Sequence, residues 1–208
     1  CIVVTPGASG ALLLALGLLA GPGDAVLMAD PGYPCNRHFA RFCEAHAINV
    51  PVDADSGFQL TLELIERHAT AATRAVLIAS PSNPTGTAMA ADELERIHDW
   101  CAVHGIALIV DEIYLALTYD GLEHSAAHWD DVFVVNSFSK FFLMTGWRLG
   151  WLAAPAWAMP ALERLAQNLF LAAPTPAQHA ALAAFAPATL GMLEACKAEL
   201  RVRRDYLL

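Results

Sequence analysis

The sequence predicts an α/β fold in which seven short strands form a mainly parallel sheet. Three observations support this fold. First, apolar runs without alternation, such as Ala75–Ala79, are typical of strands that are buried on both faces of a sheet. Second, segments with a helical spacing of apolar residues separate most of these runs. Third, the chain has 208 residues, 56% of them hydrophobic, which is enough to bury one large core.

The strands and helices are expected in regular order along the chain. Ile2–Val4 is the first expected strand, and the helix Ala11–Ala20 follows it until Gly21-Pro22-Gly23 ends the helical pattern. The other strands are expected at Ala25–Ala29, Ile48–Val52, Ala75–Ala79, Ile106–Val110, Val132–Val135 and Arg148–Ala153. The helices between them are expected at Asn36–His46, Leu60–Ala69 and Asp92–His104, and the Ala/Leu-rich stretch from Ala156 onward is also expected to be helical.

The composition argues against several classes of function. The net charge is −9 and the chain has no stripe of lysines or arginines, so we expect no nucleic-acid partner. Glycines and prolines interrupt the uncharged residues 1–23, so we expect no membrane span there. Five cysteines without a C-x-x-C motif predict reduced thiols and a cytoplasmic protein. The chain opens on an apolar run without an initiator Met, so we expect a fragment of a longer protein.

Polar clusters follow five of the expected strands at the point where each strand ends. These clusters are Thr5–Gly10, Asp30–Tyr33, Ser80–Gly86, Asp111–Tyr114 and Ser137–Lys140. Open α/β sheets bind their ligands at the carboxyl ends of the strands. The sequence therefore predicts one ligand site built from these five clusters.

The stretch from Asn136 to Trp151 carries the strongest chemical signal. Lys140 lies among phenylalanines, and an apolar setting favours the neutral amine that can attack a carbonyl. Eight residues later, Arg148 offers the planar guanidinium fork that commonly binds a phosphate. Together these residues suggest an aldehyde cofactor that carries a phosphate. The alternative is a buried lysine stem with its head in solvent and an ordinary surface arginine.

Three further features fit a cofactor site, although each has a structural alternative. Gly7–Gly10 opens a helix whose free backbone N–H groups suit a phosphate, but it could be an ordinary turn between strand and helix. Asp111 ends an apolar strand, and its expected burial requires a partner, either a protonated ring nitrogen or Arg148. Tyr33 could stack on a flat ring or could fill its own loop.

Two histidine-containing groups have spacings that metal sites also use. We expect both groups to be solvated surface, because neither has a complete set of ligands, and we therefore predict no metal site. The groups are Glu123, His124 and His128, and His98, Cys101 and His104.

Five motifs together resemble the class I/II aminotransferases, the fold-type-I enzymes that use pyridoxal 5′-phosphate (PLP). The resemblance covers nearly the whole chain, and it is the order and spacing of the motifs that make it specific. The motifs are Thr-Pro-Gly-Ala-Ser-Gly-Ala-Leu from Thr5, Asp-Pro-Gly-Tyr-Pro from Asp30, Ser-Asn-Pro-Thr-Gly from Ser82, Asp-Glu-Ile-Tyr from Asp111, and Ser-Phe-Ser-Lys from Ser137 followed by Gly-Trp-Arg-Leu-Gly from Gly146.

The resemblance implies a role for each of ten residues around PLP. Lys140 would form the Schiff base and later shuttle a proton, and Asp111 would keep the pyridine nitrogen protonated. Asn83 and Tyr114 would hydrogen-bond the phenolic oxygen, and Tyr33 would stack on the ring. The phosphate would be held by Ala8, Ser9, Ser137, Ser139 and Arg148. The catalytic residues would be Lys140, Asp111 and Tyr114.

The resemblance also implies the fold and domain organisation. Residues 1–186 would form the large PLP-binding domain, a three-layer sandwich in which the last strand of the sheet runs antiparallel. Residues 187–208 would begin the helix that leads to a small domain. The arginine that grips the substrate carboxylate and the N-terminal segment that closes the site would lie outside this chain. We therefore expect the 208-residue chain alone to be inactive.

The implied activity is transfer of an amino group between an L-amino acid and a 2-oxo acid in amino acid biosynthesis, by a homodimer. Other PLP chemistry stays open, namely a carbon–sulfur β-lyase or a decarboxylase, as does a non-catalytic effector domain of a transcriptional regulator. A short-chain dehydrogenase is set aside, because that class needs a Tyr-x-x-x-Lys pair and none of the four tyrosines has a lysine four residues on.

Overall fold

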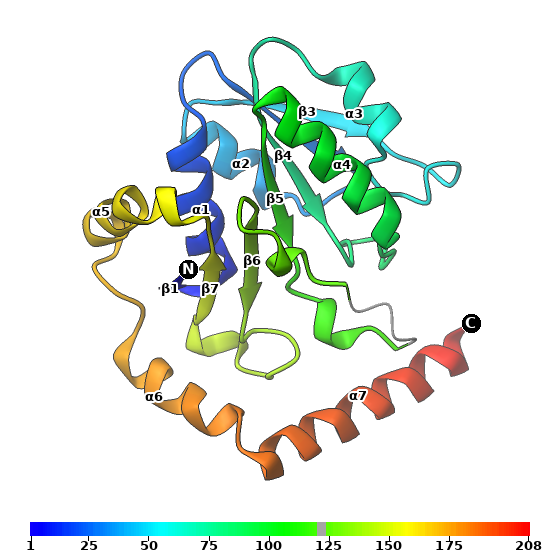
Figure 1. Cartoon of the computed structure of the whole chain (residues 1–208). Helices are drawn as coiled ribbons and strands as arrows, with labels where there is room; N and C mark the ends of the chain where they lie inside the picture. Colours follow the sequence, from blue (N-terminus) through cyan, green and yellow to red (C-terminus); the bar gives the residue numbers. More distant parts are fainter. Residues whose placement is uncertain (120–123) are drawn as a thin grey trace.

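The computed structural model of the chain describes residues 1–119 and 124–208 and contains one seven-stranded sheet with helices on both faces (Figure 1). The strands are β1 (Ile2–Thr5), β2 (Ala25–Asp30), β3 (His46–Pro51), β4 (Thr73–Ala79), β5 (Ala107–Asp111), β6 (Phe133–Ser137) and β7 (Gly150–Ala153). The α-helices are α1 (Gly7–Leu19), α2 (Cys35–Phe42), α3 (Leu62–His68), α4 (Ala91–His104), α5 (Met159–Leu169), α6 (Thr175–Ala184) and α7 (Pro187–Leu207). Four short 3-10 turns complete the structure: η1 (Leu115–Leu117), η2 (Ala126–His128), η3 (Thr145–Trp147) and η4 (Ala156–Ala158).

The sheet has the strand order β1-β7-β6-β5-β4-β2-β3. Five strands pair in parallel, namely β3, β2, β4, β5 and β6, whereas β7 pairs antiparallel with both β6 and β1. The predicted mainly parallel sheet of seven strands, with its last strand antiparallel, is confirmed.

Two apolar layers cover the two faces of the sheet, and the alternation along β4 shows how they divide. Ala75 and Leu77 of β4 contribute to the layer beneath α1, α2 and α5, whereas Val76 and Ile78 contribute to the layer beneath α3 and α4. Because successive side chains of a strand point to opposite faces, a strand that is apolar throughout can feed both layers. The result is the three-layer arrangement that the family resemblance implies (Figure 1).

Some element boundaries differ from the expected ones. The last strand was expected from Arg148 but begins at Gly150, because Arg148 has a left-handed backbone (φ 51°, ψ 55°) directly after η3. The first helix begins four residues earlier than expected, at Gly7, so the glycine-containing turn is itself the first turn of α1. The second helix ends at Phe42 rather than at His46, which is instead the first residue of β3.

The C-terminal helices α6 and α7 extend away from the sheet (Figure 1). A third, smaller cluster joins α6 to the segment after β6, through Ala177 and Ala181 on the helix and Phe138, Met144 and Leu149 on that segment. Within the described residues, no single helix is both long and apolar enough to span a membrane. The pair α6 and α7 passes that test only when the two are taken together, and they are bent by 82°.

Candidate active site

A cavity of about 210 Å³ lies at the carboxyl ends of the strands, where the sequence predicts a ligand site. Its walls come from the loops after β1, β2, β4, β5 and β6 and from the turn before β7. Nine of the ten residues that the sequence analysis assigned to the cofactor line this cavity: Ala8, Ser9, Tyr33, Asn83, Asp111, Tyr114, Ser139, Lys140 and Arg148. The structure therefore brings together residues that are up to 140 positions apart in the sequence.

Lys140 lies three residues after β6 and its amine faces the cavity. Its Nζ lies 5.4 Å from the centre of the Tyr114 ring. The phenylalanines near Lys140 do not line the cavity, contrary to the setting that the sequence suggested. Phe138 and Phe142 instead contact each other with ring centres 4.8 Å apart, and they pack into the cluster with α6. Their packing fixes the loop that carries Lys140, while the amine itself faces the cavity beside the Tyr114 ring.

Asp111 is the last residue of β5 and is buried, as the sequence predicts, with 6% of its surface exposed. Its Oδ1 accepts a hydrogen bond from the backbone N–H of Ile113 at 3.1 Å. Burial raises the pKa of the Asp111 carboxyl to about 6, and the charge of Glu112 acts in the same direction, while the Ile113 N–H and Lys140 act against it. Among the described residues this carboxylate has no close cationic partner, so a cation bound in the cavity would be stabilised by it.

Arg148 is not that partner, so the structural alternative for Asp111 is not supported among the described residues. The Nη1 atom of Arg148 donates to the carbonyl of Thr145 at 3.0 Å and to Ser139 Oγ at 3.3 Å. The other end of the guanidinium lies against Gly7, where a Cβ atom, if the residue carried one, would overlap Nη2 and come within 3.0 Å of Cζ. Gly7 also has a positive φ of 75°, which L side chains rarely adopt.

The N-terminus of α1 meets this guanidinium at one end of the cavity. The first turn of α1 contains no acidic residue, and no side chain caps it by hydrogen bonding within the described residues. Its backbone N–H groups and the positive end of the helix dipole favour an anion. Together with Arg148 and the hydroxyl of Ser139, they form a site with the chemistry that a phosphate group requires.

Ser137 is the one assigned residue that does not line the cavity. Its side chain is 2% exposed, and its Oγ lies 3.0 Å from the carbonyl of Leu149 and 2.9 Å from Ser139 Oγ. It also accepts a hydrogen bond from the backbone N–H of Ser139 at 3.0 Å. Ser137 therefore positions Ser139 from behind and does not reach the ligand space, because its place at the end of β6 turns it toward the interior.

Two contributions to the site were not expected from the sequence: Thr145, and the close approach of the Arg148 guanidinium to Gly7. Thr145 lines the cavity, its hydroxyl donates to the carbonyl of Ser139, and its own carbonyl holds Arg148. Its place between Lys140 and Arg148 was the available signal, but only the structure shows that η3 folds it back to the cavity.

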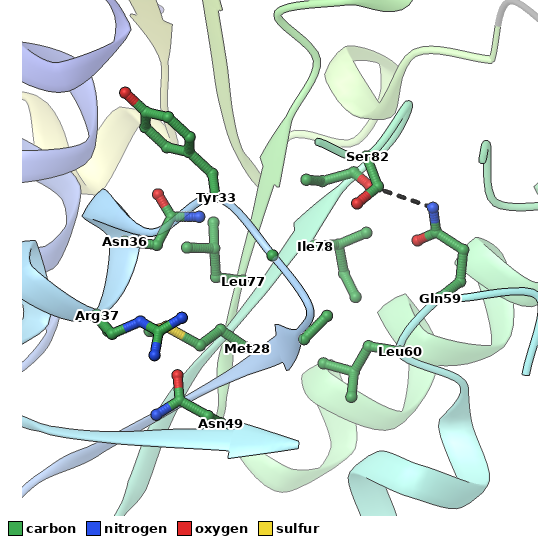
Figure 2. Close-up of a pocket in the computed structure, with 13 residues that line it drawn as sticks. Met28, Tyr33, Asn36, Arg37, Asn49, Gln59, Leu60, Leu77, Ile78 and Ser82 are labelled. Carbon is green, nitrogen blue, oxygen red and sulfur yellow. Dashed lines mark hydrogen bonds between the residues drawn. The ribbon is translucent and has the colours of Figure 1, made fainter. Parts of the chain in front are cut away.

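A second, smaller cavity of about 20 Å³ lies beside the first and shares Tyr33 and Ala79 with it (Figure 2). Its size corresponds to about one water molecule, so it is too small for a cofactor. On one side of it, Gln59 donates to the carbonyl of Ala79 at 3.4 Å and to that of Thr87 at 2.7 Å. These bonds join the end of β4 to the loop that carries Asn83.

The candidate metal ligands do not converge. His98 is largely covered rather than solvated, because it stacks on Trp129 at 4.3 Å and its two ring nitrogens contact carboxylates of Asp99 and Asp131. Cys101 on the same helix faces the core, and burial raises the pKa of its thiol to about 12. Glu123 lies outside the described residues, and the described residues contain no group of three ligands that could hold a metal ion.

Replacing Asp111 with Asn tests the burial of this carboxyl without any ligand. The folded-state pKa of about 6 exceeds the usual 3.8, so the contribution of the group to stability is full below pH 3.8 and is lost as the pH rises through 6. Asn does not titrate. The stability of Asp111→Asn relative to the wild type should therefore increase by up to about 3 kcal/mol between pH 4 and pH 7. Urea unfolding at several pH values measures this difference, and parallel stability curves would contradict it.

Comparison with known proteins identifies the family. The whole chain, residues 1–208, matches the family model described as aminotransferase class I and II. A valine–pyruvate aminotransferase of Mycobacterium tuberculosis is 37% identical over 210 residues, which cover 100% of this chain and 54% of that protein. An arginine–pyruvate transaminase of Pseudomonas aeruginosa is 36% identical over 211 residues, which cover 100% of this chain and 53% of that protein.

Solved structures agree with this match. The crystal structure of an aminotransferase from Mycobacterium tuberculosis has a TM-score of 0.94 at 37% identity and covers 100% of this chain and 57% of its own. Aspartate aminotransferase from Thermus thermophilus with maleate has a TM-score of 0.93 at 30% identity and covers 98% and 55%. The chain spans about half the length of these relatives. With its motifs, its fold and its cavity all in agreement, the chain belongs to the class I and II aminotransferase family.

Proposed function

We propose that this chain is the PLP-binding part of an aminotransferase that transfers an amino group between an L-amino acid and a 2-oxo acid. The observation that carries the proposal is one cavity that combines an amine, a buried carboxylate and an anion site. These three groups are Lys140, Asp111 and the pairing of Arg148 with the first turn of α1. They fit the carbonyl, the ring nitrogen and the phosphate of PLP respectively.

When bound, PLP supplies an electrophilic carbonyl and a ring that accepts electrons from the substrate carbon. The residues of the chain do the rest. Lys140 binds the cofactor and then holds and moves the substrate proton at Nζ. Asp111 keeps a proton on the ring nitrogen, since a buried carboxylate is most stable beside a cation. Asn83 and Tyr114 would hydrogen-bond the phenolic oxygen of bound PLP, and Tyr33 would cover its ring.

The substrate class rests on the relatives and not on the cavity. The names of two relatives include valine, arginine and pyruvate, and a third is an aspartate aminotransferase. These names support amino acids as donors and 2-oxo acids as acceptors. Because the chain spans about half the length of these relatives, the residues that select the substrate are not assigned in it.

Borohydride reduction of the protein with PLP tests the first step. The cofactor should become covalently attached to the peptide that contains Lys140, and Lys140→Ala should abolish this labelling. Lys197 is the other lysine of the chain and serves as the internal control. Peptide mass spectrometry reads the position, and label confined to Lys197 would contradict the proposed role of Lys140.

Amino transfer itself is to be measured on the protein as its gene encodes it. Valine, arginine or aspartate is supplied as donor with pyruvate or 2-oxoglutarate as acceptor, and both products are quantified. Equal amounts of new amino acid and new 2-oxo acid support the transaminase. Release of ammonia or of carbon dioxide without an acceptor would indicate the lyase or the decarboxylase instead.

Arg148→Lys tests the phosphate site. Lysine keeps the charge but loses the fork, in which Nη1 donates to Thr145 and Ser139 while Nη2 lies against Gly7. The affinity for PLP should fall by about 1.5–3 kcal/mol, the usual range for a charged hydrogen bond, when apo-protein is titrated with PLP. Gly7→Ala should also lower the affinity for PLP, because the added Cβ would displace Nη2 of Arg148.

Arg74→Lys provides the matched control for this titration. Arg74 lies near the amino end of β4, at the opposite edge of the sheet, where it pairs with Asp24 at 3.0 Å. Its replacement should leave the affinity for PLP unchanged. Equal affinities for the wild type and Arg148→Lys would place Arg148 outside the phosphate site.

We also propose that the protein is a cytoplasmic homodimer. The five cysteines are free thiols, which fits a reducing compartment. An apolar cavity of about 440 Å³ opens beside β1, lined by Ile2, Val4 and the rings of Phe141, Phe142 and Phe185. Ile2 and Val4 remain 64% and 45% exposed, which supports a second subunit on this surface.

Sedimentation analysis tests the dimer. The wild type should sediment as a dimer and Val4→Asp as a monomer, because a carboxylate would be desolvated in the interface. Val103→Asp on α4 is the control, since Val103 is 82% exposed and lies away from this cavity. A wild type that is monomeric at all concentrations would contradict the proposal.

A further inference from the structure

We propose that Glu112 is a positioning residue that holds Tyr114 in the cavity by anchoring the chain around it. The inference rests on the proposed PLP site, because it assigns a task to a residue next to Asp111. Glu112 belongs to the Asp-Glu-Ile-Tyr motif, but it does not line the cavity. It is nevertheless a buried carboxylate with 3% of its surface exposed, which calls for a reason.

Both carboxylate oxygens of Glu112 have partners from a segment further along the chain. Oε2 accepts from the hydroxyl of Ser125 at 2.8 Å, and Oε1 accepts from the backbone N–H of Ala126 at 2.6 Å. Burial raises the pKa of Glu112, and these two hydrogen bonds oppose that shift because they favour the ionised form. The hydroxyl of Ser125 and the N–H of Ala126 therefore stabilise the negative charge of Glu112.

The anchoring segment is itself fixed. Ser125 Oγ also accepts from the backbone N–H of Ala127, which caps the turn η2. Ala126 is completely buried in the apolar layer beneath α4, together with Val132 and Val134. The side chain of Glu112 thus connects the end of β5 to a part of the core.

The backbone of Glu112 makes two further hydrogen bonds. Its N–H donates to the carbonyl of Val135 at 2.9 Å, so it continues the pairing of β5 with β6 by one residue. Its carbonyl accepts from the N–H of Leu115 at 2.9 Å and so closes the turn that contains Tyr114. The side chain, the N–H and the carbonyl of Glu112 therefore all help to fix Tyr114, whose ring centre lies 5.4 Å from Lys140 Nζ.

The alternation of a strand explains why two adjacent carboxylates differ. Successive side chains point to opposite faces, so Asp111 faces the cavity while Glu112 faces the layer of α4. Asp111 can therefore contact a ligand, whereas both carboxylate oxygens of Glu112 are bound within the protein.

Three variants separate positioning from charge. Glu112→Ala removes both hydrogen bonds. Glu112→Gln keeps the shape, accepts from Ala126 and can donate to Ser125, whose hydroxyl also accepts, so it removes only the charge. Ser125→Ala removes one bond and remains usable if Glu112→Ala fails to fold. Glu93→Ala is the matched control, because Glu93 accepts from the backbone N–H of Leu62 at 2.7 Å and lies outside both site cavities.

The direct readout is the position of Tyr114 in crystals of the apo-proteins, which requires no cofactor. In Glu112→Ala the Tyr114 ring should move away from Lys140, whereas in Glu112→Gln and Glu93→Ala it should stay in place. A Tyr114 ring that keeps its place in Glu112→Ala, or in Ser125→Ala if the former does not fold, would overturn the inference. If the wild type fails to bind PLP, the proposed function is wrong, and this readout still decides the role of Glu112.

The second readout is the dissociation constant for PLP in a double-mutant cycle with Tyr114→Phe. Glu112→Ala should raise the dissociation constant for PLP about tenfold and should change the absorption maximum of the bound cofactor. Ser125→Ala should raise the dissociation constant about threefold. Glu112→Gln and Glu93→Ala should stay within twofold of the wild type. In the Tyr114→Phe background the effect of Glu112→Ala should shrink to less than threefold. Full additivity would show that Glu112 acts without Tyr114 and would overturn the inference.

Discussion

The close approach of three backbone segments at Gly150 is the constraint on which the site depends. A side-chain carbon at Gly150 would lie 2.7 Å from the carbonyl oxygen of Asn136 and from the carbonyl carbon of Gly7, and 2.9 Å from the nitrogen of Ala8. Only glycine permits this contact. Through it, β7 brings the turn with Arg148 to the start of α1, while β6 delivers Lys140 to the same place. The anion site and the amine are thus set by one packing contact.

The burial of Asp111 at the end of β5 lowers the stability of the folded protein. Burial raises the pKa of Asp111, which has no close cationic partner among the described residues, and this destabilises the protein near neutral pH. Its neighbour Glu112 is equally buried but has two donors. Both oxygens of Glu112 are used by donors of the protein, whereas Asp111 accepts one hydrogen bond, from Ile113, and faces the cavity, so it can also bind a ligand. A buried carboxylate with a raised pKa in an otherwise stable framework is typical of functional sites.

The fold and most of the site could be predicted from the sequence because both follow from local patterns. Uninterrupted apolar runs such as Ala75–Ala79 identify buried strands, and polar residues directly after them identify the ligand edge. What could not be predicted depends on directions that a pattern does not encode. Ser137 differs from Ser139 only in which way it points, and His98 differs from a solvated histidine through the ring of Trp129 and the carboxylates of Asp99 and Asp131. The left-handed backbone of Arg148 likewise became visible only in the structure.

The place of β1 in the sheet has a consequence for synthesis on the ribosome. Among the described residues, β1 pairs with β7 alone, so Ile2 meets Ala153 and Thr5 meets Gly150. Translation at 5–20 residues per second separates these partners by roughly 8–30 s. Throughout that interval an apolar edge has no strand beside it, while β2 to β6 can already assemble in parallel. The strand Ile2–Thr5 therefore stays without its partner strand until β7 has been synthesised.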